Sequence, residues 1–232
     1  MIKSDVLDKG FIEVVDSLGN DLTVVNSARV SFGKRKEKWD KSDERLVRYL
    51  AKHKHYSPFR HLQVQFHIKA PEFVMRQWYK HVVGIETTSN SSAKDHAWNE
   101  ISGRYVEVED YHRPSVYRQQ SEDNKQASEG EIQQQELANF VWDSTMRSVK
   151  EAYDGLLKLG VAKEQARAIL PLSQYTEVYW TASFQAIMNF IELRNEKTSQ
   201  WEIQEYAKVL LQQMKEVFPK TTELWSEAHG WV

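Results

Sequence analysis

The sequence predicts a mixed α/β fold in a single domain, residues 1–232, with a central, mostly antiparallel sheet flanked by helices and long helices at its end. Two patterns support this prediction. One segment alternates apolar and polar residues with the period of two that strands show, and several later segments repeat apolar residues at helical spacing. No internal repeat, low-complexity tract or clear boundary divides the chain, and 41% apolar residues are enough for a hydrophobic core.

The clearest predicted strand covers residues 61–70. Leu62, Val64, Phe66 and Ile68 point to one side of it, and polar residues alternate on the other. Shorter strands are predicted from Phe11 to the turn at Gly19-Asn20, over 105–109 and over 175–181. The polar segments 33–41, 83–98 and 119–128 are predicted to be loops or connections.

The helices follow from apolar spacing and from capping residues. A short helix is predicted from Asp21, another capped by Ser42, and a third with Pro71 as its first residue. Longer helices are predicted over 128–159, 162–170, 183–195 and 200–218. The helix over 128–159 is expected to bury one apolar face, formed by Leu137, Phe140, Val141, Val149, Tyr153 and Leu156 or Leu157.

The composition excludes several classes of function. Thirty-three acidic residues against 31 basic ones give a net charge of −2, the wrong sign for a protein that neutralises duplex phosphates, so no nucleic-acid partner is expected. No cysteine is present, which removes disulfides, thiolate metal sites and cysteine nucleophiles. The N-terminus does not resemble a secretory signal and no apolar run suits a bilayer, so we expect no membrane association and a cytoplasmic location.

Generic catalytic motifs are absent. The sequence contains no phosphate-cradling glycine loop, nucleophile elbow or H-E-x-x-H motif. His53, His55, His61 and His67 are close in sequence, but no carboxylate lies among them at ligand spacing. We therefore predict no metal site.

An anion site is suggested by Ser102-Gly103-Arg104, which offers a hydroxyl, backbone N–H groups and a guanidinium. A capped turn with a solvated arginine is the alternative. Arg167 and Arg194 stand in apolar helical segments, where a guanidinium needs either a protein carboxylate or an anionic ligand as partner.

These segments together resemble the flavin-dependent thymidylate synthase family, and the resemblance runs nearly from end to end. The matching segments include Ala28-Arg29-Val30-Ser31-Phe32, His53 to Phe59, Arg76-Gln77-Trp78, Asn99 to Tyr105, Leu170-Pro171-Leu172, Met188-Asn189-Phe190 and Gln200 to Gln204. The resemblance implies reductive methylation of dUMP to dTMP, with methylenetetrahydrofolate as carbon donor and FAD, reduced by NADPH, as hydride carrier. The lack of cysteine agrees with it, because the other known route to thymidylate uses a cysteine nucleophile.

The resemblance also assigns residues to the site. Arg194 matches the arginine that polarises the uracil, and Ser102 is expected to bind phosphate rather than act as a nucleophile. His55 and Tyr105 are candidates for the folate or nicotinamide face. The matches to dUMP-binding positions are Gln77, Lys80, Glu100, Ile101, Ser102, Gly103, Arg104, Arg167 and Arg194. The matches to FAD-binding positions are Ser57, Lys80, His81, Val82, Glu100, Ser183, Gln185 and Asn189. The family further implies a homotetramer with active sites at subunit interfaces.

The chain departs from the family signature, arginine-histidine-arginine followed by seven residues and a serine. Here the triplet is Lys80-His81-Val82, and nineteen residues, 83–101, precede Ser102. Gln185 stands where an arginine that contacts the flavin is usual, and Ser183 replaces an asparagine. In the insertion, Lys94, His96 and Trp98 are available as replacement contacts.

The sequence allows two alternative functions. The first is a non-catalytic nucleotide-binding homologue that has lost the flavin, which the altered signature allows. The second is a flavin enzyme that methylates uracil within a polynucleotide, against which the net charge and the phosphate turn speak.

Overall fold

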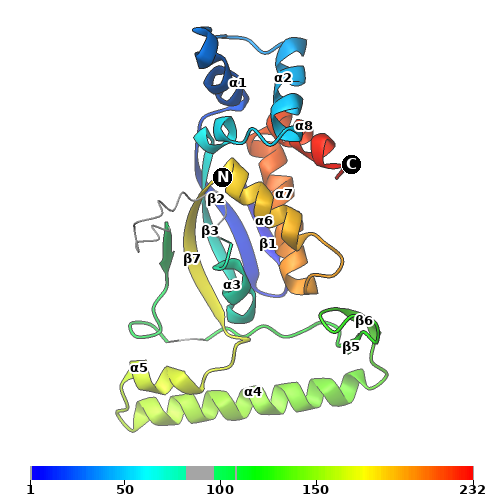
Figure 1. Ribbon diagram of the computed structural model, residues 1–232. Coiled ribbons are helices and arrows are strands. Elements are labelled where there is room, and N and C mark those ends of the chain that lie inside the picture. Colours follow the sequence, from blue (N-terminus) through cyan, green and yellow to red (C-terminus); the bar gives the residue numbers. More distant parts are fainter. Residues whose placement is uncertain (1, 82–96, 108, 232) are drawn as a thin grey trace, which may run out of the picture.

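A five-stranded sheet forms the centre of the protein in a computed structural model that describes residues 2–81, 97–107 and 109–231 (Figure 1). The strand order is β1-β2-β3-β7-β4, and every pairing is antiparallel. This confirms the predicted α/β class and the antiparallel sheet. The strands are β1 Ile2–Val6, β2 Gly10–Leu18, β3 Gln63–Pro71, β7 Tyr175–Ser183 and β4 Trp98–Glu100.

The middle of the sheet is the pairing of β3 with β7. The predicted alternation is confirmed, because Leu62, Val64, Phe66 and Ile68 are completely buried. Phe66 lies opposite Trp180 of β7, and their rings stack with centroids 5.7 Å apart. The strands predicted from Phe11 and over 175–181 are β2 and β7, so the register and the apolar face agree with the sequence pattern.

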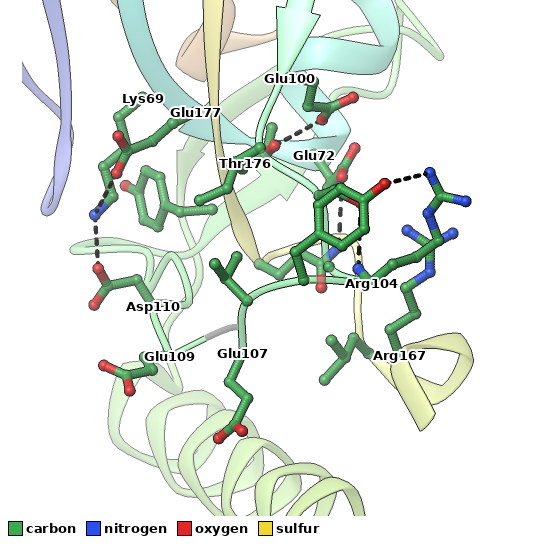
Figure 2. A pocket seen from close by; sticks show the side chains of 18 of the residues that line it. Lys69, Glu72, Glu100, Arg104, Glu107, Glu109, Asp110, Arg167, Thr176 and Glu177 are labelled. Carbon is green, nitrogen blue, oxygen red and sulfur yellow. Dashed lines mark hydrogen bonds and ion pairs between the residues drawn. The ribbon is translucent and has the colours of Figure 1, made fainter. Parts of the chain in front are cut away.

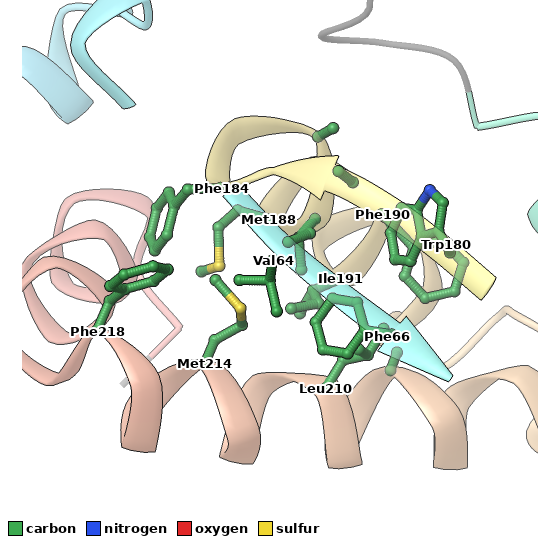
Figure 3. Close-up of a cluster of buried hydrophobic side chains, with 14 of the residues drawn as sticks. Val64, Phe66, Trp180, Phe184, Met188, Phe190, Ile191, Leu210, Met214 and Phe218 are labelled. Carbon is green, nitrogen blue, oxygen red and sulfur yellow. The ribbon is translucent and has the colours of Figure 1, made fainter. Parts of the chain in front are cut away.

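Helices cover the apolar face of the sheet. Figure 1 places α6 and α7 along it, with α8 beyond the end of the sheet beside α2. Figure 3 shows Val64 of β3 near Met188 of α6, and Phe66 near Leu210 of α7. The predicted helices from Asp21, over 183–195 and over 200–218 are present, whereas α8 was not predicted. The long and short helices are α1 Asp21–Arg29, α2 Lys41–Lys52, α3 Glu72–Trp78, α4 Gln135–Lys158, α5 Lys163–Ala166, α6 Phe184–Arg194, α7 Trp201–Val217 and α8 Pro219–His229.

The described residues also contain three 3₁₀ helices, of which η2 and η3 carry predicted site residues. They are η1 Val30–Phe32, η2 Ser57–His61 and η3 Arg167–Ile169. Within η2, Pro58 and Phe59 are buried in the core. The predicted helix over 162–170 is divided into α5 and η3.

Two predicted helix starts are wrong by one or two residues. Asp40, not Ser42, caps α2, because the Asp40 carboxylate accepts the Ser42 N–H at 2.7 Å. Pro71 ends β3 and occupies the N-cap of α3 rather than its first turn. Because α3 ends at Trp78, Lys80 and His81 follow the helix instead of belonging to it.

Two sheet predictions are also wrong. The described residues of the segment 105–109 form no strand, since the Tyr105 N–H donates to the Ser102 carbonyl at 2.9 Å in a turn. The polar connection over 119–128 belongs to a hairpin of β5 Arg118–Gln120 and β6 Ser128–Glu131, so α4 begins only at Gln135. Both strands consist of polar residues and glycine, so the sequence shows no apolar alternation that would identify them.

The prediction that α4 buries its apolar face is wrong. Leu137, Phe140 and Val141 are 55%, 69% and 54% exposed, and only Tyr153 among the predicted residues is buried. Figure 1 shows α4 lying beyond the end of the sheet, where it contacts α5 and η3. Periodicity identifies an apolar face but does not say what covers it.

Replacing Phe66 by Ala should lower the free energy of unfolding by about 3–5 kcal/mol, because the ring is fully buried between β7 and the helices. Gln65→Ala, on the opposite face of the same strand, is the control and should change it by less than about 1 kcal/mol. Urea unfolding at equal protein concentration measures both. Similar losses for the two variants would contradict the assigned core face.

Candidate active site

A cavity of about 940 Å³ lies where β3 ends and β7 begins (Figure 2). Its wall consists of the turn that follows β4, part of η3 and the adjoining end of the sheet. The sequence-predicted residues that the structure brings together here are Glu100, Ile101, Ser102, Gly103, Arg104, Tyr105 and Arg167.

The Ser102-Gly103-Arg104 turn packs directly against Arg167. A Cβ on Gly103 would lie 3.3 Å from Arg167 Cδ, so this close approach favours glycine. The Arg104 N–H donates to Ser102 Oγ at 3.3 Å, and its guanidinium donates to the Tyr105 hydroxyl at 3.3 Å. Figure 2 shows Arg104 and Arg167 on the same side of the cavity.

Neither Arg104 nor Arg167 forms a salt bridge with a carboxylate in the part of the chain that the structure describes. Two neighbouring guanidinium groups repel each other unless an anion lies between them or water screens them. The arrangement is therefore suited to a phosphate, which both groups can contact with paired N–H donors.

Six glutamates are among the residues that line the same cavity, and two of them, Glu72 and Glu100, lie at its sheet and helix wall. Glu100 accepts a hydrogen bond from Thr176 Oγ1 at 2.6 Å, which fixes its carboxylate at the start of β7. Glu72 lies in the first turn of α3, and burial, with a smaller effect from Glu100, raises the pKa of its carboxyl. Sequence reasoning missed Glu72, because an acidic residue in a first helical turn is ordinary.

Ion pairs close the other side of the cavity. Lys69 Nζ lies 2.7 Å from Asp110 and 3.6 Å from Glu177, and Lys9 lies 3.0 Å from Asp110. The hydrogen bonds from Lys69 and Lys9 lower the pKa of Asp110. These contacts hold the segment around Asp110 against the polar face of the sheet.

The other predicted dUMP residues, Gln77, Lys80 and Arg194, do not line the cavity. They lie near the C-terminal ends of α3 and α6, together with the predicted flavin residue His81, and are called the Arg194 group below. Arg194 Nε donates to His81 Nε2 at 2.7 Å, Gln77 donates to Gln200 at 2.6 Å, and Lys80 is exposed. One chain therefore holds the predicted nucleotide residues in two groups.

Burial, followed by the charge of Arg194, lowers the pKa of His81 from 6.5 to about 4. The ring is therefore neutral near pH 7, and it accepts through Nε2, which assigns the proton to Nδ1. Burial also lowers the pKa of Arg194, but a guanidinium remains charged at neutral pH.

Two predicted flavin residues are occupied by contacts within the protein. Ser183 and Gln185, at the start of α6, are only 7% and 4% exposed. Ser183 Oγ accepts the Ala186 N–H at 3.3 Å, and Gln185 Oε1 accepts Arg60 Nε–H at 2.6 Å. Both side chains are therefore held by contacts within the protein through their oxygen atoms, and their direct contact with flavin stays a prediction.

The remaining flavin positions are more accessible. Ser57 and Lys80 are exposed, and His81 and Asn189 are half-buried, so they offer a cation and hydrogen-bonding groups that fit an anionic dinucleotide. His55 is exposed, with its ring stacked 6.0 Å from that of Tyr49. Val82 and most of the insertion, with Lys94 and His96, lie outside the described residues; Trp98 belongs to β4 and stacks on Trp180.

The residues that the structure describes contain no group of three metal-ligating side chains that could hold an ion. In the same residues, no helix has the length and apolar character needed to cross a membrane.

Comparison with known proteins shows the family of the chain. The family model "Thymidylate synthase complementing protein" matches residues 13–220. The chain is 40% identical over 219 residues to a flavin-dependent thymidylate synthase of Thermus thermophilus, covering 92% of this chain and 74% of that protein. It is 41% identical over 223 residues to the enzyme of the same name from Thermosipho melanesiensis, covering 94% and 91%. The chain therefore belongs to the flavin-dependent thymidylate synthase family, and the predicted resemblance is confirmed.

A solved structure matches as well. The UMP/dUMP methylase PolB from Streptomyces cacaoi, bound to 5-Br dUMP, superposes with a TM-score of 0.82. Its sequence is 28% identical, and the match covers 97% of both chains. The α/β architecture is thus shared over 97% of each chain.

The His81–Arg194 contact predicts a pH effect. Because the folded pKa is depressed, the contribution of neutral His81 to stability is complete above pH 6.5 and is lost as the pH falls through about 4. NMR titration should find His81 near 4. In Arg194→Gln the value should rise but stay below 6.5, because burial is the larger cause. Titration of His81 at 6.5 in both proteins would contradict this assignment.

Proposed function

We propose that the protein is an enzyme that methylates dUMP reductively to dTMP, with methylenetetrahydrofolate as carbon donor and NADPH as reductant of bound FAD. The family membership and the likeness to a methylase bound to 5-Br dUMP support the reaction class. The observation that carries the proposal is the convergence of Arg104 and Arg167 on the Ser102-Gly103 turn without a salt bridge to a carboxylate of the described residues.

In this proposal the turn binds the phosphate of dUMP. The Ser102 hydroxyl donates a hydrogen bond to a phosphate oxygen, and the guanidinium groups of Arg104 and Arg167 neutralise the negative charge of the phosphate. Ser102 has no role as a nucleophile. Glu100, held by Thr176, and the neighbouring backbone of Ile101 orient the rest of the nucleotide.

Arg194 polarises the uracil in this proposal. FAD, when bound and reduced, supplies the hydride that completes the methyl group. The neutral His81 ring accepts from Arg194 Nε and so fixes the plane of the guanidinium without cancelling its charge. A partly buried, preorganised cation stabilises charge that develops on the pyrimidine more strongly than a solvated one. Gln77 and Lys80 belong to the same half of the nucleotide site.

The separation of the two groups supports a site shared between chains. We propose a homotetramer in which the cavity of one chain faces the Arg194 group of another. The exposed apolar face of α4, with Leu137, Phe140 and Val141, adjoins a groove of about 520 Å³ lined also by Trp142 and Tyr117. An apolar surface of this kind is typical of a subunit interface.

The remaining assignments are proposals of the same kind. His55 and Tyr105 contribute to the folate or nicotinamide face. The domain over residues 1–232 carries the whole activity.

A cytoplasmic location suits substrates that are soluble nucleotides and reduced folate. The burial and internal hydrogen bonds of Gln185 and Ser183 are the observations that favour one alternative, a nucleotide-binding homologue without flavin.

The experiment is an anaerobic assay of dTMP formation from dUMP, methylenetetrahydrofolate and NADPH, with and without added FAD. Flavin-dependent product is expected. No product at high FAD, with dUMP binding intact, would favour the non-catalytic homologue, and preference for a uracil-containing oligonucleotide would favour polynucleotide methylation.

Arg194→Ala should reduce turnover by about 100-fold or more while FAD stays bound, because it removes the cation that polarises the substrate. Arg48→Ala is the matched control, since Arg48 only pairs with Glu227 at the surface. Flavin content is measured by absorbance and turnover by product formation. Normal turnover in Arg194→Ala would remove Arg194 from the catalytic role.

A further inference from the structure

Glu72 differs from the other glutamates that line the cavity in its burial and in its partners. Four of the six cavity glutamates are exposed to solvent, namely Glu100, Glu107, Glu109 and Glu164. Glu177 is half-buried but lies 3.0 Å from His67 Nε2 and 3.6 Å from Lys69 Nζ. Glu72 is half-buried as well, and within residues 2–81, 97–107 and 109–231 it forms no salt bridge. Neither phosphate binding nor uracil polarisation uses this carboxyl.

The segment that leads into β7 holds Glu72 in place. The Glu72 N–H donates to the Gln174 carbonyl at 2.9 Å, and the Phe73 N–H donates to the Leu172 carbonyl at 3.0 Å. Gln174 Nε2 also donates to Glu72 Oε1, at a long 3.4 Å. No other side chain in the described part of the protein donates to this carboxyl. Oε2 is therefore left to accept from water or from a ligand.

The carboxyl of Glu72 would gain from a further donor. Burial, followed by the charge of Glu100, raises its pKa, and these effects outweigh the opposing hydrogen bond from Gln174 and the charges of nearby arginines. A partly buried carboxylate is stabilised by each hydrogen bond that it accepts, and such bonds are stronger than those between neutral groups. A ligand that brings an O–H or N–H to Oε2 should therefore bind more tightly than one that lacks it.

Glu72 also lies close to the proposed phosphate site. Figure 2 shows Glu72 between Glu100 and the arginines of the phosphate turn, and the charge of Arg167 acts on its pKa. When Arg104 and Arg167 bind the phosphate of a nucleotide, the sugar is the next part of that nucleotide along the same wall. The sugar is therefore the group that Glu72 meets.

The chemistry of dUMP leaves one donor for this position. Its deoxyribose carries a single hydroxyl, on C3′, and its pyrimidine carries a single N–H, on N3. The proposed function places the pyrimidine at Arg194 of another chain, so the 3′-hydroxyl is the donor that remains near Arg104 and Arg167. An ionised carboxylate only accepts hydrogen bonds, so it suits this hydroxyl and disfavours an acceptor or an anion at the same place.

We propose that Glu72 accepts a hydrogen bond from the 3′-hydroxyl of dUMP and so selects nucleoside 5′-monophosphates whose 3′-position is free. This rests on the proposed function, because it presumes that the phosphate binds to Arg104 and Arg167. A uracil nucleotide within a polynucleotide has an esterified 3′-oxygen, and its next phosphate would lie beside the carboxylate, where like charges repel. Glu72 therefore disfavours polynucleotide substrates.

The test compares dUMP with 2′,3′-dideoxyuridine 5′-monophosphate, which lacks only the 3′-hydroxyl. Isothermal titration calorimetry on the full-length protein with added FAD measures both affinities. The wild type should bind dUMP about 10-fold or more tightly, the effect of one hydrogen bond to a charged group. In Glu72→Leu the two affinities should differ by less than about 2-fold. The ratio is the readout, because removal of a negative charge also changes the attraction of the phosphate, and this change is the same for both nucleotides.

Glu107→Leu is the matched control. It removes a negative charge from the same cavity, but Glu107 is exposed and lies 3.3 Å from Lys163, so this variant should keep the wild-type preference for dUMP. Circular dichroism would confirm that each variant is folded. If Glu72→Leu does not fold, Glu72→Gln keeps the size of the side chain and should also reduce the preference, because a neutral acceptor binds a hydroxyl more weakly than a carboxylate does.

Equal affinity of the wild type for the two nucleotides, or an unchanged preference in the folded Glu72 variants, would overturn the role of Glu72. Because dUMP would still bind, either result would leave the proposed function intact. A wild type that binds neither nucleotide would overturn both.

Discussion

The antiparallel pairing of β3 with β7 determines where every part of the site lies. From Gln63 opposite Ser183 to Pro71 opposite Tyr175, the two strands run together without a bulge. At one end the pair leads into η2 and α6, and at the other it leads into α3 and the wall of the cavity. The stacked rings of Phe66 and Trp180 lie between these ends. A shift of this register by one residue would turn the core face outward and displace both groups of polar residues.

Electrostatics differ between the two groups of residues. In the cavity, Arg104 and Arg167 lie together, and neither forms a salt bridge with a carboxylate among the described residues; the proposed function uses their charge to bind a phosphate. At the end of α6, Arg194 is paired with a neutral histidine, whose depressed pKa keeps it an acceptor. At the start of α6, Gln185 Oε1 accepts from Arg60 Nε. At the end of α6 the uncharged His81 ring orients the Arg194 guanidinium and preserves its charge, which fits anion binding better than a carboxylate partner would.

Much of the fold could be predicted from the sequence, because the strand that contains Phe66 has one buried face and therefore a clear alternation. The Ser102-Gly103-Arg104 turn was also predictable, since its residues are adjacent in sequence. Pairs such as Arg60 with Gln185 were not, because 125 positions separate them. The apolar face of α4 was recognised, but its exposure was not, since periodicity does not distinguish a core from an interface. Glu72 was missed because it has no local signal of a site.

The proposed active site joins the cavity of one chain to Arg194 of another. Co-expression of Arg104→Ala and Arg194→Ala chains with different tags, followed by purification on both tags, tests it directly. Each variant alone should be nearly inactive, whereas random hybrid tetramers should regain about a quarter of the wild-type activity, because sites with both arginines form between unlike chains. Hybrids that stay as inactive as the separate variants would contradict the shared site and place both arginines in the site of a single chain.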